Sequence, residues 1–165
     1  MSAVQESLFE TVTRKPKPKS VHIVNLRMVR EKTVKYESAV STQVDMVNMV
    51  KELFKNSYRE MVVVIGLDWC NKPTIIHVVG VGSPNSAPVC ISSIFKPLLL
   101  SNSSSCILVH NHPASTMSPS ECDKEITRRV FEVGKLLEIA LVDHLILNAD
   151  ASDYYSMRNA PFWPR

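Results

Sequence analysis

The residues of this chain best suited to chemistry lie in one stretch, "LVHNHPASTMSPSECDKE" at 108–125. His110 and His112 are two positions apart, so on an extended segment their side chains share a face, about 7 Å apart along the strand. Two imidazoles and the carboxylate of Asp123 would leave a tetrahedral zinc ion one open position for water, as catalytic zinc sites do. The pattern predicts a zinc site. The competing interpretation is a hydrogen-bonded surface pair, which is what an isolated H-x-H more often is.

The segment from Ser118 has the features of a helix start. Ser118 is the expected N-cap, Pro119 occupies the first helical position and Glu121 is the capping-box partner. Ser120 and Asp123 then lie three residues apart on one helix face, inside the first turns, so capping would not explain them. We expect the loop from the histidine strand to bring this face back over the strand end.

The rest of the chain alternates between apolar runs and amphipathic segments, which predicts an α/β fold. One mixed sheet is expected from strands at 61–68, 74–81, 105–110 and 140–148, with a short edge strand in "DYYSM". The first two runs are predicted to be buried central strands. Helices are expected at 41–56, 91–102 and 118–140. Their predicted buried stripes are Val44, Val47, Val50 and Phe54 in the first, and Ile126, Val130, Val133 and Leu137 in the last. A strand or hairpin is predicted to begin at 21–29.

Length and composition indicate one domain at 19–165, preceded by a disordered basic tail at 1–18. The tail holds most of "RKPKPK", which indicates either a solvated tail or a nucleic-acid contact. No apolar run approaches the ~20 residues of a membrane span, and no signal peptide is visible, so we expect a cytoplasmic protein with no membrane partner. The four cysteines form no C-x-x-C pair, which argues against a cysteine zinc site.

Other H-x-H chemistries fit these residues less well. Metallo-β-lactamase folds need H-x-H-x-D-H, whereas Ala114 and Ser115 follow here, and amidohydrolase barrels need a longer chain. Nucleotide deaminases need P-C-x-x-C, and "PSECD" supplies one cysteine.

The spacing of His110, His112, Ser120 and Asp123 resembles the signature of the JAMM (JAB/MPN) metalloprotease-like family. The flanks "GLDWCNKPTIIHVVGVGS" and "IFKPLLLSNSSSCILVHNHP" look like its RadC-like branch, and the resemblance covers about 21–157. It implies a three-layer-like JAB/MPN fold related to cytidine deaminases, with a mixed β-sheet flanked by helices. It also implies an upstream catalytic glutamate before the first core strand, a place that Glu60 occupies.

The resemblance implies a zinc-dependent hydrolase that acts on a peptide or isopeptide bond of a protein or peptide substrate. Glu60 would take a proton from a zinc-activated water, and Ser120 would stabilise the oxyanion. Glu52 is the weaker substitute for Glu60. The alternative is a DNA-associated accessory or anti-restriction protein whose JAB fold serves binding, in line with the family's DNA-repair label. Two segments depart from the family pattern near the expected cleft, Ala114-Ser115-Thr116 and Cys90-Ile91-Ser92-Ser93.

Overall fold

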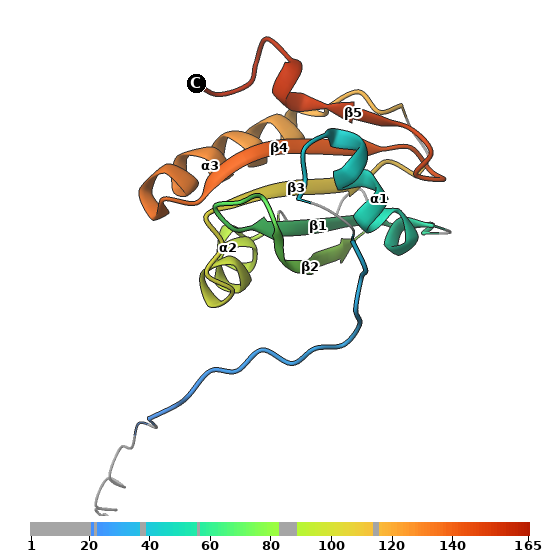
Figure 1. Cartoon of the computed structure of the whole chain (residues 1–165). Coiled ribbons are helices and arrows are strands. Elements are labelled where there is room, and N and C mark those ends of the chain that lie inside the picture. Colours follow the sequence, from blue (N-terminus) through green and yellow to red (C-terminus); the bar gives the residue numbers. More distant parts are fainter. Residues whose placement is uncertain (1–20, 22, 37–38, 56, 83–88, 114–115) are drawn as a thin grey trace, which may run out of the picture.

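The computed structural model describes residues 21, 23–36, 39–55, 57–82, 89–113 and 116–165. Their core is a mixed sheet in the order β2-β1-β3-β4-β5, with helices packed on it (Figure 1). The strands are β1 (Glu60–Leu67), β2 (Pro73–Gly82), β3 (Ser105–Asn111), β4 (Ala140–Leu147) and β5 (Tyr154–Ser156). The helices are α1 (Gln43–Phe54), α2 (Ile91–Leu100) and α3 (Glu121–Leu137), with a 3-10 turn at Met157–Asn159. Strands β3 and β4 pair in parallel and the other neighbours are antiparallel. The expected α/β fold with one mixed sheet is confirmed.

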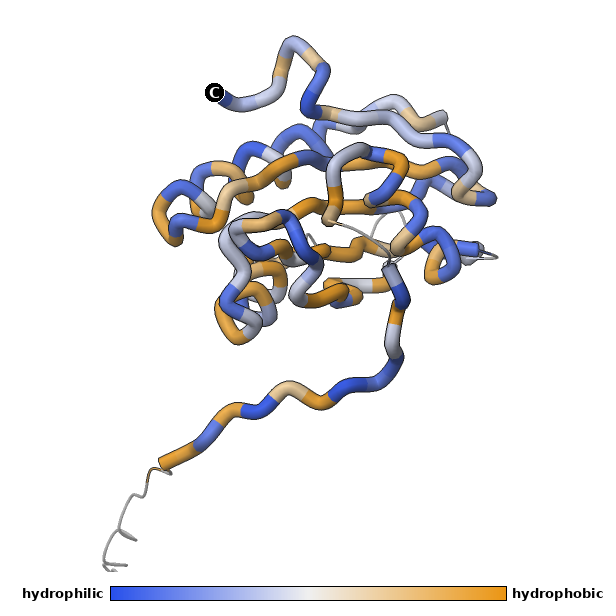
Figure 2. Tube along the Cα trace, in the orientation of Figure 1, coloured by the Kyte–Doolittle hydropathy of each residue, from blue (hydrophilic) through white to orange (hydrophobic). Residues whose placement is uncertain are grey.

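Each face of the sheet buries its own apolar core, because alternate residues of a strand point to opposite faces. Val63 and Ile65 of β1 lie in the core that α1 covers, whereas Val64 lies in the core shared with α2 and α3. The central strands are the most hydrophobic part of the chain trace (Figure 2). The sheet therefore forms the middle layer of three, and α3 lies on the face opposite α1.

The helices form where apolar spacing predicted them, with differences at the edges of the buried stripes. Thr42 caps α1 through a capping box with Asp45. Val44 was expected in the buried stripe of α1 but is 54% exposed, and Leu137 at the end of α3 is 39% exposed. Both lie in a terminal turn of their helix, beyond the part that packs on the sheet. None of the helices that the structure describes is long and apolar enough to cross a membrane.

Two strand predictions were wrong. The apolar run at 74–81 forms β2, but β2 is an edge strand with exposed Val78 and Val81, because β1 takes β3 as its other neighbour. The strand or hairpin expected from 21–29 is absent from residues 21 and 23–36, which run as an extended, exposed segment. A β-rich composition forms a strand only when a partner strand is in reach, and within the described chain this segment leads away from the sheet (Figure 1).

The tail predicted at 1–18 lies outside the described residues, so its role is open to a direct test. We expect that removing these residues changes the melting temperature by no more than about 1 °C, because they offer few apolar groups to bury. Thermal unfolding of the full and trimmed chains measures this. A drop of several degrees would mean that the tail packs on the domain and that the predicted boundary is misplaced.

Candidate metal centre

The predicted metal ligands come together where the end of β3 meets the start of α3. His110 and His112 are buried, and Asp123 lies in the first turn of α3. The two Nε2 atoms are 3.0 Å apart. Asp123 places Oδ1 3.2 Å from His110 Nε2 and Oδ2 3.5 Å from His112 Nε2. All three residues offer a ligand atom within 4.8 Å of the others, so they form a group that could hold one metal ion.

The hydrogen bonds of His112 show which of its ring nitrogens faces the group. Its Nδ1 lies 2.9 Å from the carbonyl oxygen of Thr116, which accepts hydrogen bonds and never donates them. Nδ1 therefore carries the proton, and in a neutral ring Nε2 presents a lone pair toward His110 and Asp123. Nitrogen lone pairs and a carboxylate directed at one point repel each other unless a cation lies between them. Two imidazoles with one carboxylate are also a ligand set that zinc favours, so the residues present fit a zinc ion.

Residues of the candidate metal group shift one another's pKa values. Burial alone would raise the pKa of Asp123, but the imidazoles of His110 and His112 beside the carboxylate outweigh burial and hold that pKa well below its usual range. The hydrogen bond to Asp123 raises the pKa of His112, and the negative charge of Glu60 adds to this effect. A proton on Nε2 thus occupies the position that a metal would take, so proton and metal compete for the same lone pair.

The helix cap differs from the sequence prediction, because α3 begins at Glu121 and its N-cap is Ser120. The Ser120 hydroxyl accepts a hydrogen bond from the Asp123 backbone N–H, and the Asp123 carboxylate accepts one from the Ser120 backbone N–H. The assignment of the cap to Ser118 was therefore wrong. Both Ser118-x-x-Glu121 and Ser120-x-x-Asp123 fit the capping-box pattern, and sequence alone does not rank two overlapping boxes.

Asp123 therefore has two functions in the fold, as capping-box partner and as part of the candidate metal group. Its Oδ2 also accepts a hydrogen bond of 2.6 Å from the Ser120 hydroxyl. The cap fixes the carboxylate in orientation before any ion binds. Such preorganisation lowers the cost of assembling a site.

Glu60 is the first residue of β1 and lies near the same group. In the antiparallel pairing of β1 with β3, Val62 is opposite His110, so their side chains share a face of the sheet. Glu60 is two residues before Val62 and points to that face as well. Its side chain is half-buried.

Asn111, which separates the two histidines, clamps the backbone on both sides of Glu60. Its side-chain oxygen accepts the Met61 N–H at 2.9 Å, and its amide group donates to the Arg59 carbonyl at 3.3 Å. The two bonds hold the β1 backbone on either side of Glu60, next to the last pair of the β1–β3 ladder, in which Val62 lies opposite His110. Asn111 thereby ties the position of Glu60 to the strand that bears the histidines.

Asn111→Ala is expected to lower the free energy of unfolding by about 1–3 kcal/mol, because it leaves the buried Met61 N–H without its acceptor. Denaturant unfolding measures the change. Asn48→Ala is the matched control, since Asn48 lies exposed on α1 and its replacement should change stability by less than about 0.5 kcal/mol. Equal free energies of unfolding for Asn111→Ala and Asn48→Ala would contradict a stabilising role of the Asn111 hydrogen bonds.

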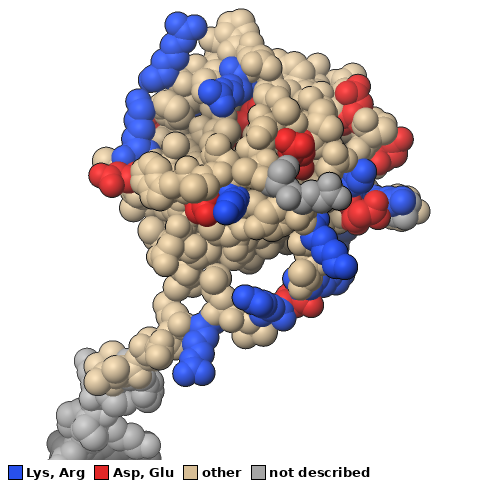
Figure 3. All heavy atoms as spheres, viewed as in Figure 1, with Lys and Arg blue, Asp and Glu red and all other residues tan. Residues whose placement is uncertain are grey.

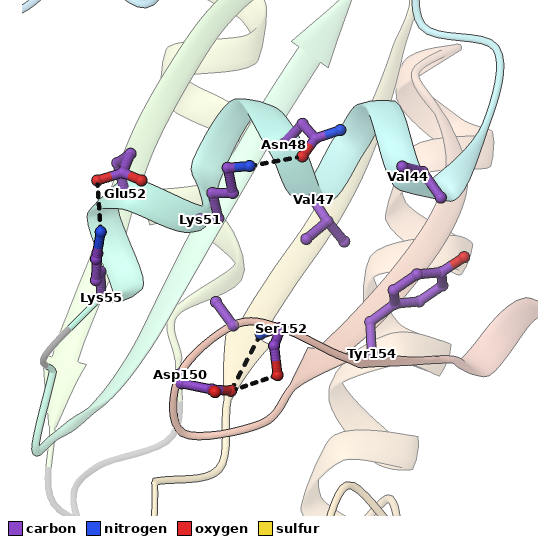
Figure 4. Close-up of a pocket in the computed structure, with 10 residues that line it drawn as sticks. Val44, Val47, Asn48, Lys51, Glu52, Lys55, Asp150, Ser152 and Tyr154 are labelled. Carbon is purple, nitrogen blue, oxygen red and sulfur yellow. Dashed lines mark hydrogen bonds and ion pairs between the residues drawn. The ribbon is translucent and has the colours of Figure 1, made fainter.

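Glu52, the weaker substitute for the catalytic glutamate, lies elsewhere. It is on α1, on the other face of the sheet, where it forms an exposed ion pair with Lys55. Figure 4 shows both residues at the rim of a hollow of about 400 Å³ between α1 and the loop that contains Asp150. The hollow is lined by neither the candidate metal ligands nor Glu60 and Ser120.

A family model described as "RadC-like JAB domain" matches residues 40–162, which is most of the chain. The chain belongs to the RadC-like JAB domain family. The resemblance seen in the sequence is thereby confirmed, and the mixed sheet with flanking helices is consistent with the JAB fold.

Relatives of this RadC-like JAB domain carry the name UPF0758 protein. One from Clostridium botulinum is 35% identical over 144 residues, which are 85% of this chain and 62% of the relative. One from Caldanaerobacter subterraneus is 35% identical over 109 residues, or 66% and 47% of the two chains. One from Chloroflexus aurantiacus is 46% identical over 81 residues, or 49% and 35%. The match covers less than two thirds of each relative, so the activity of the longer proteins does not transfer by identity alone.

Three polar residues around the site were missed in the sequence: Asn111, Thr127 and His144. All three are buried. A possible signal was their polarity within otherwise apolar elements, above all Asp143-His144 in the run "ALVDHLILN". A buried polar side chain requires partners, so such positions indicate a hydrogen-bond network even when the partners are unknown. The altered loop residues Ala114 and Ser115 lie outside the described residues.

Proposed function

We propose that this RadC-like JAB domain is a zinc-dependent hydrolase of the JAMM type that cleaves a peptide or isopeptide bond in the cytoplasm. The observation that supports it most is the convergence of His110 Nε2, His112 Nε2 and the Asp123 carboxylate within 4.8 Å. Three protein ligands leave zinc an open position, which distinguishes catalytic sites from structural ones.

In this proposal His110, His112 and Asp123 hold zinc, which would supply Lewis-acid chemistry and lower the pKa of a coordinated water toward about 7. Glu60 accepts the proton of the attacking water on its carboxylate and returns that proton to the leaving amine. The support for this role is its position on the histidine face of the sheet and its electrostatic effect on His112. Asn111 orients Glu60 through the backbone of β1.

Ser120 is the proposed donor to the oxyanion that forms on the scissile carbonyl. Its hydroxyl donates to Asp123 Oδ2 in this structure and accepts from the Asp123 N–H. To act as an oxyanion donor, the hydroxyl has to turn its hydrogen away from Oδ2 while it keeps the cap bond through its lone pair. A hydroxyl has the one donor and two acceptor sites that this exchange requires.

A screen of zinc-loaded protein tests the proposal. Quenched-fluorescence peptide libraries and isopeptide-linked lysine peptides are the probes, with 1,10-phenanthroline as the chelator. We expect cleavage in one of the two sets, loss of cleavage with the chelator, and recovery when zinc is added back. Cleavage that the chelator leaves unchanged, or no zinc binding at all, would refute a zinc hydrolase.

A nucleic-acid-binding role is the second candidate, and the basic character of the extended segment favours it. Blue side chains follow this segment where it leaves the domain in Figure 3. Its exposed basic residues are Arg27, Arg30, Lys32 and Lys35, against one acidic residue, Glu31. Retention on immobilised DNA that weakens steeply between low and moderate salt would support this role. Salt-independent retention or none would refute it.

A further inference from the structure

A series of hydrogen bonds between buried polar groups connects the candidate metal centre to the interior of the domain. His110 Nδ1 lies 2.8 Å from His144 Nε2, and His144 Nδ1 lies 2.6 Å from the Thr127 hydroxyl. The Thr127 hydroxyl lies 2.6 Å from the Asp123 carbonyl oxygen. Thr127 and His144 are both fully buried, between α3 and β4, and neither belongs to the group that would hold the metal.

The Asp123 carbonyl oxygen at the end of this series determines the direction of every hydrogen bond in the series. The Asp123 carbonyl can only accept a hydrogen bond, so the Thr127 hydroxyl donates its one hydrogen to it. The lone pairs of that hydroxyl are then available to accept a hydrogen bond from His144. His144 Nδ1 must then carry a proton to donate to Thr127. In a neutral imidazole this leaves His144 Nε2 as an acceptor, and His110 Nδ1 donates to it.

We propose that Thr127 and His144 are positioning residues that hold His110 in its Nδ1–H tautomer. His110 Nε2 is then left with a lone pair directed at His112 Nε2 and Asp123, where a metal ion would bind. Histidine ligands of metals commonly have the second nitrogen tied in this way by a carboxylate, a carbonyl or water. Here a second histidine does so, and Thr127 determines which of its nitrogens accepts. The inference rests on the metal site of the proposed function.

Thr127 is needed because either ring nitrogen of a neutral histidine can carry the proton. His144 by itself would serve His110 equally well as a donor or as an acceptor. As a donor it would leave His110 with its proton on Nε2, which is the wrong atom for a metal ligand. The hydroxyl removes that option because it keeps the His144 proton on Nδ1. The same helix turn supplies Asp123, so one segment of α3 provides a ligand and sets the tautomer of another.

The experiment compares Thr127→Val with Thr127→Ser in the metal-free protein. Valine keeps the shape of threonine and removes the hydroxyl, whereas serine keeps the hydroxyl and loses a methyl group. Ring-nitrogen chemical shifts from NMR at a pH above neutrality report the tautomer of His110, and competition with a coloured chelator reports the affinity for zinc ions. We expect wild type and Thr127→Ser to show His110 protonated on Nδ1, with zinc affinities within about 3-fold of each other. In Thr127→Val we expect a mixture of tautomers and an affinity about 10-fold lower or more.

The outcomes separate this inference from the proposed function. An Nε2–H tautomer of His110 in the wild type overturns the inference without any variant. Equal zinc affinities of the folded valine and serine variants, with melting curves that show both folded, overturn it as well. A purely structural role would lower the melting temperature of Thr127→Val and leave the His110 tautomer unchanged. Failure of the proposed function looks different, because the wild type itself would then bind no zinc.

Discussion

Alanine in place of His110 or of His112 is expected to abolish zinc binding, while the wild-type protein binds about one equivalent. Each replacement leaves two protein ligands, which rarely retain zinc against a competing chelator. The group found among the described residues has three members, so each variant keeps only two of them. Elemental analysis after dialysis against a weak chelator measures the bound zinc.

His77→Ala is the matched control for this experiment. His77 is an exposed residue of the edge strand β2 and does not belong to the candidate metal group. This variant should retain the zinc content of the wild type. Because His110 and His112 are buried, circular dichroism and thermal unfolding have to show that their variants are folded. A folded variant of either residue that holds a full equivalent of zinc would contradict the ligand assignment.

Glu60→Gln is expected to reduce hydrolysis by about 100-fold or more without changing the zinc content. Glutamine keeps the size of the side chain, but it has no carboxylate to accept a proton from water. The loss should appear in kcat rather than in KM, because the carboxylate acts in the transition state and not in substrate binding. Steady-state kinetics on a peptide identified in the library screen, with parallel zinc analysis, measures both quantities.

Glu52→Gln provides the matched control, since it makes the same chemical change on the other face of the sheet. We expect its kcat to equal that of the wild type. Full activity of Glu60→Gln on a substrate whose cleavage requires zinc would remove Glu60 from the mechanism. A loss of activity in Glu52→Gln instead would transfer the role to α1, against the geometry of the structure.

Most of the fold is determined by local patterns that sequence analysis detects. The β-branched run at 61–68 and the apolar run at 105–110 became β1 and β3, because such residues favour extended backbone and burial. The helical spacing at 41–56 became α1, which Thr42 caps. The candidate metal group was also visible, because its ligands come from one stretch in which two residues share a strand face and the third follows at a helix start.

Tertiary structure decided the features that depend on which segments become neighbours. The run at 74–81 is as apolar as a central strand, yet β2 lies at the sheet edge because β1 pairs with β3. Two capping boxes overlap at the start of α3, and the box that formed places Asp123 against His110 and His112. The contact between Thr127 and His144 joins α3 to β4 across the interior.

The features visible in the sequence differ from those decided by tertiary structure for one physical reason. The sequence by itself determined the strands, the helices and the three candidate ligands, because backbone periodicity and capping act over a few residues. Only the tertiary structure decided how Asn111, Thr127 and His144 are used. A buried polar side chain acquires its role from its hydrogen-bond partners, and each of these three has a partner that is remote in sequence. His144 is 34 residues from His110, and the Asn111 side chain reaches a backbone N–H 50 residues away. The sequence thus names the ligands of the candidate site, and folding supplies the groups that orient them.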